Sequence, residues 1–383
     1  MSNKLPTVWS AEPHTIAKIS ILKNYLNAWF PIVGSRYPSV VYVDGFSGPG
    51  TYKNHAEGSP VAALRVFKSW ILKEPDRIGA KVIACFIESS QGRYELLREC
   101  VGSEKYPARL EPISICGEFQ FAFPEVLGRA DVGGALSCGH PLLLFADPFG
   151  GTGVPFQLFR DCLSNPSSEL LLNFDADGIA RIWSGRNPNW IEQLDEMFGG
   201  RDWEKALDCP SDSLAIRSLK ALELYKRILI EDAGCKYVWS FEMRGKNDRI
   251  NYYLVFATGN RLGMEKMKEA MRAIDTTGTY SFSDAHYNQH VLFRGDDIDL
   301  YSDEMHKRFL DMTVSYEDLD NYALCETPFL NPKAMLETLS RSSRVTVVPK
   351  KGEVVRAHSF PEDRIQGIFF HPAPPQEVQG TLF

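Results

Sequence analysis

The feature that most restricts the fold is an alternation of short apolar runs with helical stretches over residues 40–174. The apolar runs predict strands, which fall at residues 40–44, 81–88, 110–115, 141–147 and 169–174. Helices are predicted between them, at residues 59–72, 91–100, 118–127 and 155–163. Runs without polar interruption, such as Leu142 to Phe145, are typical of a parallel sheet that helices cover on both faces. The alternation therefore predicts a doubly wound, Rossmann-like α/β fold with a mostly parallel sheet.

Elements on either side complete this first domain. Apolar residues at helical spacing predict an opening helix at residues 13–33 and an amphipathic helix at residues 213–231. Two strands follow at residues 237–243 and 250–257, joined by a short charged turn. Because so short a link cannot cross over the sheet, these strands must form an antiparallel hairpin. We expect residues 1–275 to form one domain and residues 276–300 to connect it to the remainder.

The C-terminal part has a different pattern. Helices are predicted at residues 302–312, from Ser315, and at residues 332–340, and alternating strands at residues 345–348 and 353–356 enclose a turn with two lysines. Three helices followed by a basic hairpin resemble a winged helix, expected at residues 301–358. Residues 359–383 contain four prolines and little apolar periodicity, so a flexible tail is expected.

Charge and composition argue against a protein with a uniformly basic, nucleic-acid-binding surface. The net charge is −7 and 44% of residues are apolar, which indicates a globular protein without a uniformly basic coat. Positive charge is local, because residues 331–358 carry six Lys and Arg against Glu337 and Glu353. Contacts to DNA or RNA would therefore fall here, with Arg344, Lys350 and Lys351 as the candidates.

Targeting and metal signals are weak. No run of about 18 apolar residues and no signal peptide is evident, so we expect a cytoplasmic protein outside the membrane. The eight cysteines are scattered without a CxxC pair, and His286 and His290 are four residues apart without an evident third ligand. No metal site is predicted.

The strongest local motif follows the first predicted strand and reads Asp44-Gly45-Phe46-Ser47-Gly48-Pro49-Gly50. Glycines at a strand-to-loop turn let the backbone approach a ligand closely, although a tight turn before a helix would also use them. The acidic residue, the phenylalanine and the spaced glycines resemble the first motif of S-adenosylmethionine (SAM) methyltransferases. The resemblance implies that Asp44 accepts from the cofactor's amino group and that Phe46, Gly48 and Gly50 lie around its methionine moiety.

Two further strand ends fit the same ligand. Glu88 ends the second predicted strand, where a carboxylate can accept hydrogen bonds from both ribose hydroxyls, unless it is simply an exposed strand-end charge. Glu118 and Phe119 follow the third strand and are similar to the acidic and aromatic pair that holds adenine in these enzymes. Residues 51–58 form an extra loop that we expect to cover the cofactor.

The fourth strand ends in Asp147-Pro148-Phe149-Gly150. Amino-directed methyltransferases have Asp or Asn, two prolines and an aromatic residue at this position, and the aromatic residue stacks on a flipped base. Asp147 and Pro148 match this pattern, whereas Phe149 comes one place early. Asp147 is therefore expected to position the methyl acceptor or take its proton, and Phe149 to contact the acceptor. The alternative is that Asp147 only caps the following loop.

Over nearly the whole chain, these motifs and others resemble one family. A mostly parallel sheet with a terminal hairpin is the build of class I methyltransferases. The segments Glu12-Pro13-His14-Thr15, Tyr42 to Gly50, Gly58-Ser59-Pro60, Asp147 to Gly150 and Glu326-Thr327-Pro328-Phe329 together resemble the three-Cys-motif partner proteins (TcmP family). The resemblance implies a SAM-binding, methyltransferase-like protein whose partner, a three-Cys-motif protein, looks like a radical-SAM-type enzyme.

Two short patterns have open interpretations. His14 and Lys18 are four residues apart on one helix face, where they could close over the cofactor or contact a phosphate, or be a helix start with a solvated lysine. The C-terminal residues Gln379, Leu382 and Phe383 are similar to the peptide that binds the replication sliding clamp, although they could equally dock on their own domain.

Three functions therefore stay open at this stage. The leading one is a SAM-dependent methyltransferase that acts on or with nucleic acid. The others are a non-catalytic recognition subunit and a methyltransferase for small molecules or peptides.

Overall fold

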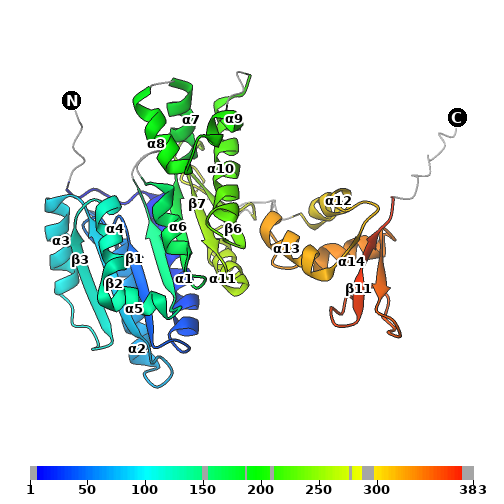
Figure 1. The fold of residues 1–383 in the computed structure, drawn as a ribbon, viewed down its shortest axis with the longest axis horizontal. Coiled ribbons are helices and arrows are strands. Elements are labelled where there is room, and N and C mark those ends of the chain that lie inside the picture. Colours follow the sequence, from blue (N-terminus) through cyan, green and yellow to red (C-terminus); the bar gives the residue numbers. More distant parts are fainter. Residues whose placement is uncertain are drawn as a thin grey trace. The chain divides into compact units, whose positions relative to one another are not determined.

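The computed structural model describes residues 7–148, 154–185, 188–207, 211–275, 278–286 and 297–372. The chain forms two compact units (Figure 1). One comprises residues 1–276 and 280–290, and the other residues 277–279 and 291–383. None of the helices in the described residues is both long enough and apolar enough to cross a lipid bilayer.

The N-terminal unit is built on one eight-stranded sheet with the order β3-β2-β1-β4-β5-β7-β6-β8. Strands β1 to β5 are parallel, and β7 is antiparallel to both β5 and β6. The predicted mostly parallel sheet with a terminal hairpin is thereby confirmed. The strands are β1 (Ser39–Asp44), β2 (Lys81–Glu88), β3 (Leu110–Cys116), β4 (Leu142–Ala146), β5 (Glu169–Phe174), β6 (Tyr237–Arg244), β7 (Ile250–Thr258) and β8 (Ser281–Ser283).

Helices cover the sheet in two layers (Figure 1). One layer is α1 (Pro13–Val33), α2 (Ser59–Lys73), α3 (Gln91–Gly102) and α11 (Arg261–Arg272). The other contains α4 (Phe119–Gly128), α5 (Ala130–Ser137), α6 (Phe156–Leu163), α7 (Ala176–Gly185) and α10 (Leu214–Glu231). The short helices α8 (Pro188–Phe198) and α9 (Asp202–Leu207) pack beside α6, α7 and α10.

Because helices cover both faces of the sheet, its strands have apolar side chains on both faces. On β1, Val41 and Val43 belong to the core beneath α4 to α6, whereas Tyr42 points the other way, with its ring 5.6 Å from that of Phe67 on α2. Successive side chains of a strand point to opposite faces, so both faces must be apolar when both are covered. All five residues of β4 are buried for this reason.

Between residues 297 and 372, the C-terminal unit contains three helices and a three-stranded antiparallel sheet with the order β10-β11-β9. The elements are α12 (Ile298–Arg308), β9 (Thr313–Val314), α13 (Tyr316–Glu326), α14 (Lys333–Arg341), β10 (Val345–Pro349) and β11 (Ile365–Phe370). The hydroxyl of Ser315 accepts from the backbone N–H of Asp318, as expected for the cap of the second helix.

Two sequence predictions fail in this unit. The strand predicted at residues 353–356 does not form, and Val354 is 86% exposed, because alternation over four residues does not require a buried face. The partner of β10 is instead β11, from the segment predicted to be a flexible tail. Ile365, Ile368 and Phe370 are buried, and the prolines lie outside the strand, so they do not interrupt it.

A third correction concerns residues 276–300, predicted as a connector. Within this segment β8 pairs in parallel with β6 and extends the main sheet. The three-residue length of β8 leaves no detectable periodicity in the sequence.

Candidate functional site

Three carboxylates meet at one edge of the main sheet. Asp44, Glu88 and Asp147 lie at the C-terminal ends of β1, β2 and β4, which are neighbours in the order β2-β1-β4. Ligands of open α/β sheets bind at this edge. The structure thus brings together three residues that are more than forty positions apart in the sequence.

Asp44 is fully buried and only partly satisfied. Its Oδ1 accepts from the backbone N–H of Phe46 at 3.3 Å, whereas Oδ2 is buried without a hydrogen bond among the described residues. Burial raises the pKa of Asp44 to about 7, the hydroxyl of Ser59 opposes the rise, and the charge of Asp147 adds to it. An unpaired carboxylate oxygen is a costly feature that a cationic ligand group would satisfy.

The glycines after β1 have separate roles. Gly48 and Gly50 have φ of 63° and 81°, in the left-handed region that favours glycine. A Cβ on Gly50 would lie 3.3 Å from the side chain of Cys100, so Gly50 also permits packing against α3. A Cβ on Gly45 would lie 2.6 Å from the ring of Phe119.

Next to Asp44, a cavity of about 210 Å³ opens between the ends of β1, β2 and β3. Four of the predicted cofactor residues line it, namely Phe46, Glu88, Glu118 and Phe119. Asp44, Gly48 and Gly50 are not on its wall. The ring of Phe119 stacks on Phe46 with centroids 5.1 Å apart, so the pair presents a flat apolar wall.

Glu88 is held in place by its neighbours. Its Oε1 accepts from the backbone N–H of Ser90 at 2.7 Å and from Nε of Arg93 at 3.0 Å. No hydrogen bond to Oε2 occurs within the described residues, and only 4% of the side chain is exposed. One oxygen therefore fixes the carboxylate and the other is available to a ligand, so Glu88 is not an exposed strand-end charge.

Asp147 has both oxygens occupied. Lys18 donates to Oδ2, and the amide of Asn173 on β5 donates to Oδ1 at 2.6 Å. Lys18 is buried, which excludes the alternative of a solvated lysine. The predicted role of Pro148 stays a prediction, and Phe149 lies outside the described residues. The occupied oxygens favour a positioning role for Asp147 over proton removal.

The Asp147 network continues along α1 and β7. The ammonium of Lys18 lies 5.2 Å from the ring centroid of Tyr252, and the ring of His14 lies 5.8 Å from the same centroid. Nδ1 of His14 is 2.7 Å from Oδ2 of Asp284. The four-residue spacing of His14 and Lys18 is visible in the sequence, but no sequence pattern indicates that Asn173, Tyr252 or Asp284 belongs to this network.

The loop at residues 51–58 closes back on the N-terminal segment. The backbone N–H of Lys53 donates to the carbonyl of Trp9 at 2.9 Å, and Asn54 exchanges two hydrogen bonds of 3.1 Å with the backbone of Ala11. Burial raises the pKa of the Tyr52 hydroxyl, and the charges of Asp147 and Asp44 add to the rise. The predicted cover over the cofactor stays a prediction.

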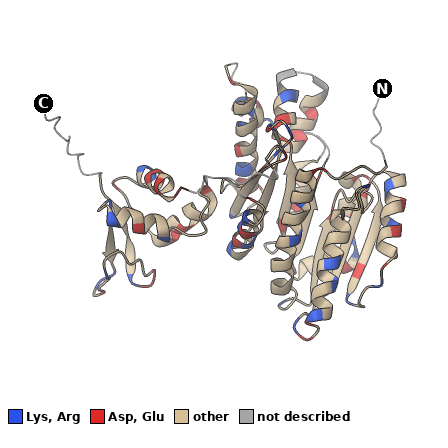
Figure 2. Ribbon diagram, turned by 180° about the vertical axis from the view of Figure 1, so that it is seen from behind, with Lys and Arg blue, Asp and Glu red and all other residues tan. Residues whose placement is uncertain are grey.

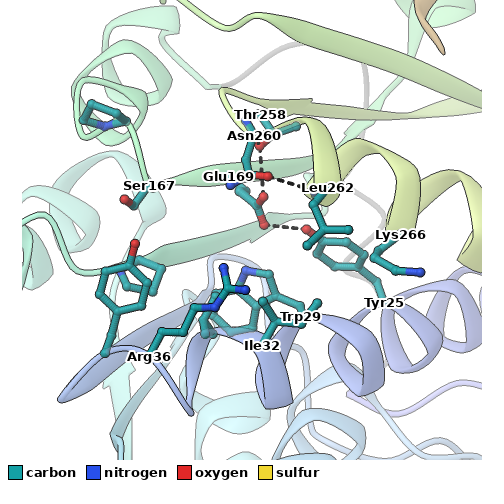
Figure 3. Close-up of a pocket in the computed structure, with 15 residues that line it drawn as sticks. Tyr25, Trp29, Ile32, Arg36, Ser167, Glu169, Thr258, Asn260, Leu262 and Lys266 are labelled. Atoms are coloured by element: carbon teal, nitrogen blue, oxygen red, sulfur yellow. Dashed lines mark hydrogen bonds between the residues drawn. The ribbon is translucent and has the colours of Figure 1, made fainter. Parts of the chain in front are cut away.

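A second pocket, of about 100 Å³, lies at the opposite edge of the sheet (Figure 3). Its wall includes Glu169, which accepts from the hydroxyl of Tyr25 at 2.5 Å and from that of Thr258 at 2.9 Å. Burial raises the pKa of Glu169 to about 7, and these hydrogen bonds oppose the rise. Trp29 of α1 and Arg36, which follows α1, complete this side of the pocket (Figure 3).

The candidate nucleic-acid residues belong to the C-terminal unit. Arg344 is paired with Asp303 at 2.5 Å, and the ammonium of Lys350 donates to the carbonyl of Asp363 at 2.9 Å. Lys350 and Lys351 are exposed where the loop between β10 and β11 begins. In residues 297–372 acidic residues outnumber basic ones, and the two signs are interspersed (Figure 2).

Two other sequence predictions fall outside the described residues. These are the clamp-like residues Gln379, Leu382 and Phe383, and His290 of the histidine pair. Among the described residues, no group of three His, Cys, Asp or Glu side chains is placed to hold a metal ion.

Comparison with known proteins yields structural likenesses only. No family model and no curated protein matches the chain. Protein LPL1258 of Legionella pneumophila is 12% identical, with 70% of this chain and 92% of that chain covered and a TM-score of 0.37. An O-methyltransferase of Bacillus cereus in complex with SAH is 11% identical, with 62% and 80% covered and a TM-score of 0.32.

A third likeness is to the O-methyltransferase TomG of Streptomyces achromogenes in complex with SAM, which is 11% identical, with 66% and 92% covered and a TM-score of 0.31. At TM-scores below 0.5 these likenesses assign no function to the chain.

Proposed function

We propose that this chain is a SAM-dependent methyltransferase. The observation that carries the proposal is that two neighbouring strand ends each have a carboxylate oxygen without a hydrogen bond among the described residues. These are the buried Oδ2 of Asp44 and Oε2 of Glu88, which lines the cavity. A ligand with a cationic amino group at one end and a ribose at the other satisfies both oxygens. S-adenosylmethionine has both groups, and the mostly parallel sheet with its antiparallel hairpin resembles the build of class I methyltransferases.

Each residue at this edge of the sheet is assigned to one part of the cofactor. Asp44 would hold the amino group, Oε2 of Glu88 the ribose hydroxyls, and Glu118 with Phe119 the adenine. When bound, the cofactor supplies a methyl group on a positively charged sulfur. The chain's part would be to align the acceptor with that methyl group. We assign this role to Asp147, and its support is that Lys18 and Asn173 fix the carboxylate.

Calorimetry with SAM and S-adenosylhomocysteine tests this proposal. Asp44→Asn keeps the shape but removes the negative charge, so we expect its affinity for SAM to fall by about tenfold or more. Glu88→Gln should also bind more weakly. Glu125→Gln, an exposed change on α4, is the matched control and should bind as the wild type does. Absence of SAM binding by the folded wild-type protein would refute the proposal.

We also propose that the C-terminal unit is a winged-helix module that presents nucleic acid. Its support is the succession of α12, β9, α13, α14, β10 and β11, with Lys350 and Lys351 exposed in the loop between the last two strands. The double variant Lys350→Gln and Lys351→Gln should reduce the salt dependence of DNA or RNA binding by a slope of about 2. Lys105→Gln, an exposed change in the N-terminal unit, should leave it unchanged. An unaltered slope in the double variant would contradict this assignment.

Resemblance to the three-Cys-motif partner proteins supports a further protein partner. The alternative in which the chain only recognises a substrate for that partner rests on the departure at Phe149. Transfer of labelled methyl groups by the purified protein alone to DNA, RNA or peptides would exclude that alternative. Co-purification with a three-Cys-motif protein, and with the sliding clamp through the C-terminal residues, tests the partners directly.

A further inference from the structure

We propose that His14, oriented by Asp284, accepts the proton of a hydroxyl group in the methyl acceptor. This inference rests on the proposed methyltransferase function and adds the chemical class of its substrate. It starts from Asp147, the expected proton acceptor, whose two oxygens already accept hydrogen bonds from Lys18 and Asn173. These two contacts suit Asp147 to a positioning role, so we assign the proton acceptor to another group of the same cluster.

His14 has the geometry of an oriented base. Nδ1 of His14 lies 2.7 Å from Oδ2 of Asp284, whose side chain is 2% exposed. Because a carboxylate only accepts, Nδ1 of the neutral ring carries the proton and Nε2 keeps its lone pair. The His14 side chain is 20% exposed, so part of the ring is open to solvent and to an incoming acceptor.

The position of His14 connects it to the cofactor edge. His14 and Lys18 occupy successive turns of one face of α1, and both side chains lie against the ring of Tyr252. Lys18 in turn contacts Asp147 at the end of β4. The two pairs, His14 with Asp284 and Lys18 with Asp147, thus meet at the ring of Tyr252.

Two unpaired polar atoms lie in the same cluster. The hydroxyl oxygen of Tyr252 and Oδ1 of Asp284 are buried without hydrogen bonds among the described residues. Burial raises the pKa of Tyr252, and the nearby charges of Asp147 and Asp284 add to the rise, so its hydroxyl stays protonated and can donate. An acceptor oxygen or an ordered water would satisfy these atoms.

The charges around His14 come from several elements. Glu12 precedes α1 and pairs with Lys246 of the β6–β7 turn at 2.8 Å. Lys18 and Asp147 face each other beyond Tyr252, and Asp284 follows β8. The pairs Glu12 with Lys246 and Lys18 with Asp147 are each neutral together, so Asp284 is the carboxylate left to stabilise the imidazolium that forms.

Methylation of a hydroxyl oxygen is coupled to the loss of its proton. The acceptor oxygen forms a bond to the methyl carbon while the bond from that carbon to sulfur breaks, and the sulfur keeps the electron pair and becomes neutral. The hydroxyl proton passes to Nε2 of His14. A hydroxyl requires such a base because it loses its proton as it is methylated, whereas a neutral ring amine can attack through its lone pair.

Nuclear magnetic resonance of the full chain labelled with ¹⁵N-histidine tests the orientation without any activity assay. We expect the neutral ring of His14 to be the Nδ1–H tautomer, identified by the loss of its signals in His14→Gln. Asp284→Asn should shift it to the Nε2–H tautomer. His140→Gln, a change at the opposite edge of the sheet, should leave the His14 signals unchanged. An Nε2–H tautomer in the wild-type protein would overturn the proposal.

Methyl transfer supplies the second test, with catechol, a short RNA and the matching DNA as probes. For a methylated probe, His14→Gln should slow single-turnover transfer about 100-fold or more and abolish the fall in rate toward acidic pH, while SAM affinity changes less than about threefold. A purely structural His14 would not alter the pH profile. Methylation of a nitrogen, or an unchanged rate in His14→Gln, would overturn the proposal. Loss of SAM binding in the wild type would instead refute the methyltransferase function, and the tautomer result would still stand.

Discussion

Replacing Glu169 by glutamine should stabilise the N-terminal unit, and the gain should grow with pH. Burial raises the pKa of Glu169 from its usual 4.5 to about 7. The folded chain therefore holds this proton more tightly than the unfolded chain, and the stability that the protonated acid contributes is lost as the pH rises through 7. At about 1.4 kcal/mol per pKa unit, ionisation of the buried acid opposes folding by about 3 kcal/mol at alkaline pH.

Glutamine has nearly the same shape. Like the protonated acid, it has one accepting oxygen and one donor group, so it can accept from one of the hydroxyls of Tyr25 and Thr258 and donate to the other. The gain of Glu169→Gln in the free energy of unfolding should thus rise from about 1 kcal/mol near pH 5 to about 3 kcal/mol above pH 8. Urea unfolding followed by tryptophan fluorescence measures it selectively, because all seven tryptophans belong to the N-terminal unit.

The matched control for Glu169 is Glu125→Gln. Glu125 is exposed on α4, so its replacement should change the free energy of unfolding little at any pH. A pH-independent difference between Glu169→Gln and the wild type, or a loss of stability above pH 8, would refute the reasoning.

Three further predictions concern other parts of the chain. Arg93→Ala should lower the free energy of unfolding by about 3 kcal/mol, because it leaves the buried carboxylate of Glu88 without its partner, and urea unfolding measures this. Gly48→Ala should lower the free energy of unfolding by about 1–2 kcal/mol, because Gly48 has a positive φ that alanine adopts only with strain. Gly50→Ala should lower it by more, because the new Cβ would also approach Cys100. Equal losses in the two variants would contradict the packing argument. Phe370→Ala should destabilise the C-terminal unit by about 3–5 kcal/mol, measured by hydrogen exchange of residues 297–372, with the tryptophan transition of the other unit unchanged.

Sequence patterns were reliable where an element buries a continuous face. The predicted ranges of β2 and β5 agree with the structure residue for residue, because both faces of these strands are covered and their apolar runs have sharp ends. Capping chemistry likewise located the start of α13 at Ser315. Short or late elements such as β8 and β11 were missed, since three to six residues carry too little pattern to distinguish a strand from a loop.

For the candidate site, the sequence predicted the carboxylates but not the residues that pair with them. Asp44, Glu88 and Asp147 were predicted from the sequence because each directly follows the apolar run of a parallel strand, and such strand ends must share one edge of the sheet. Their partners could not be predicted in this way. Arg93 lies five residues beyond Glu88, and nothing in that spacing shows that the guanidinium turns back to the carboxylate.

The sequence by itself therefore determined the layers of the N-terminal unit and the edge at which a ligand would bind, because hydrophobic periodicity is a local property that burial imposes on each element. Only the tertiary structure decided which side chains meet there. Lys18 pairs with Asp147 across 129 positions, and His14 with Asp284 across 270. Such contacts depend on how α1 packs against the ends of β4, β7 and β8, which no local pattern encodes, and they decide which groups in the site are free to act.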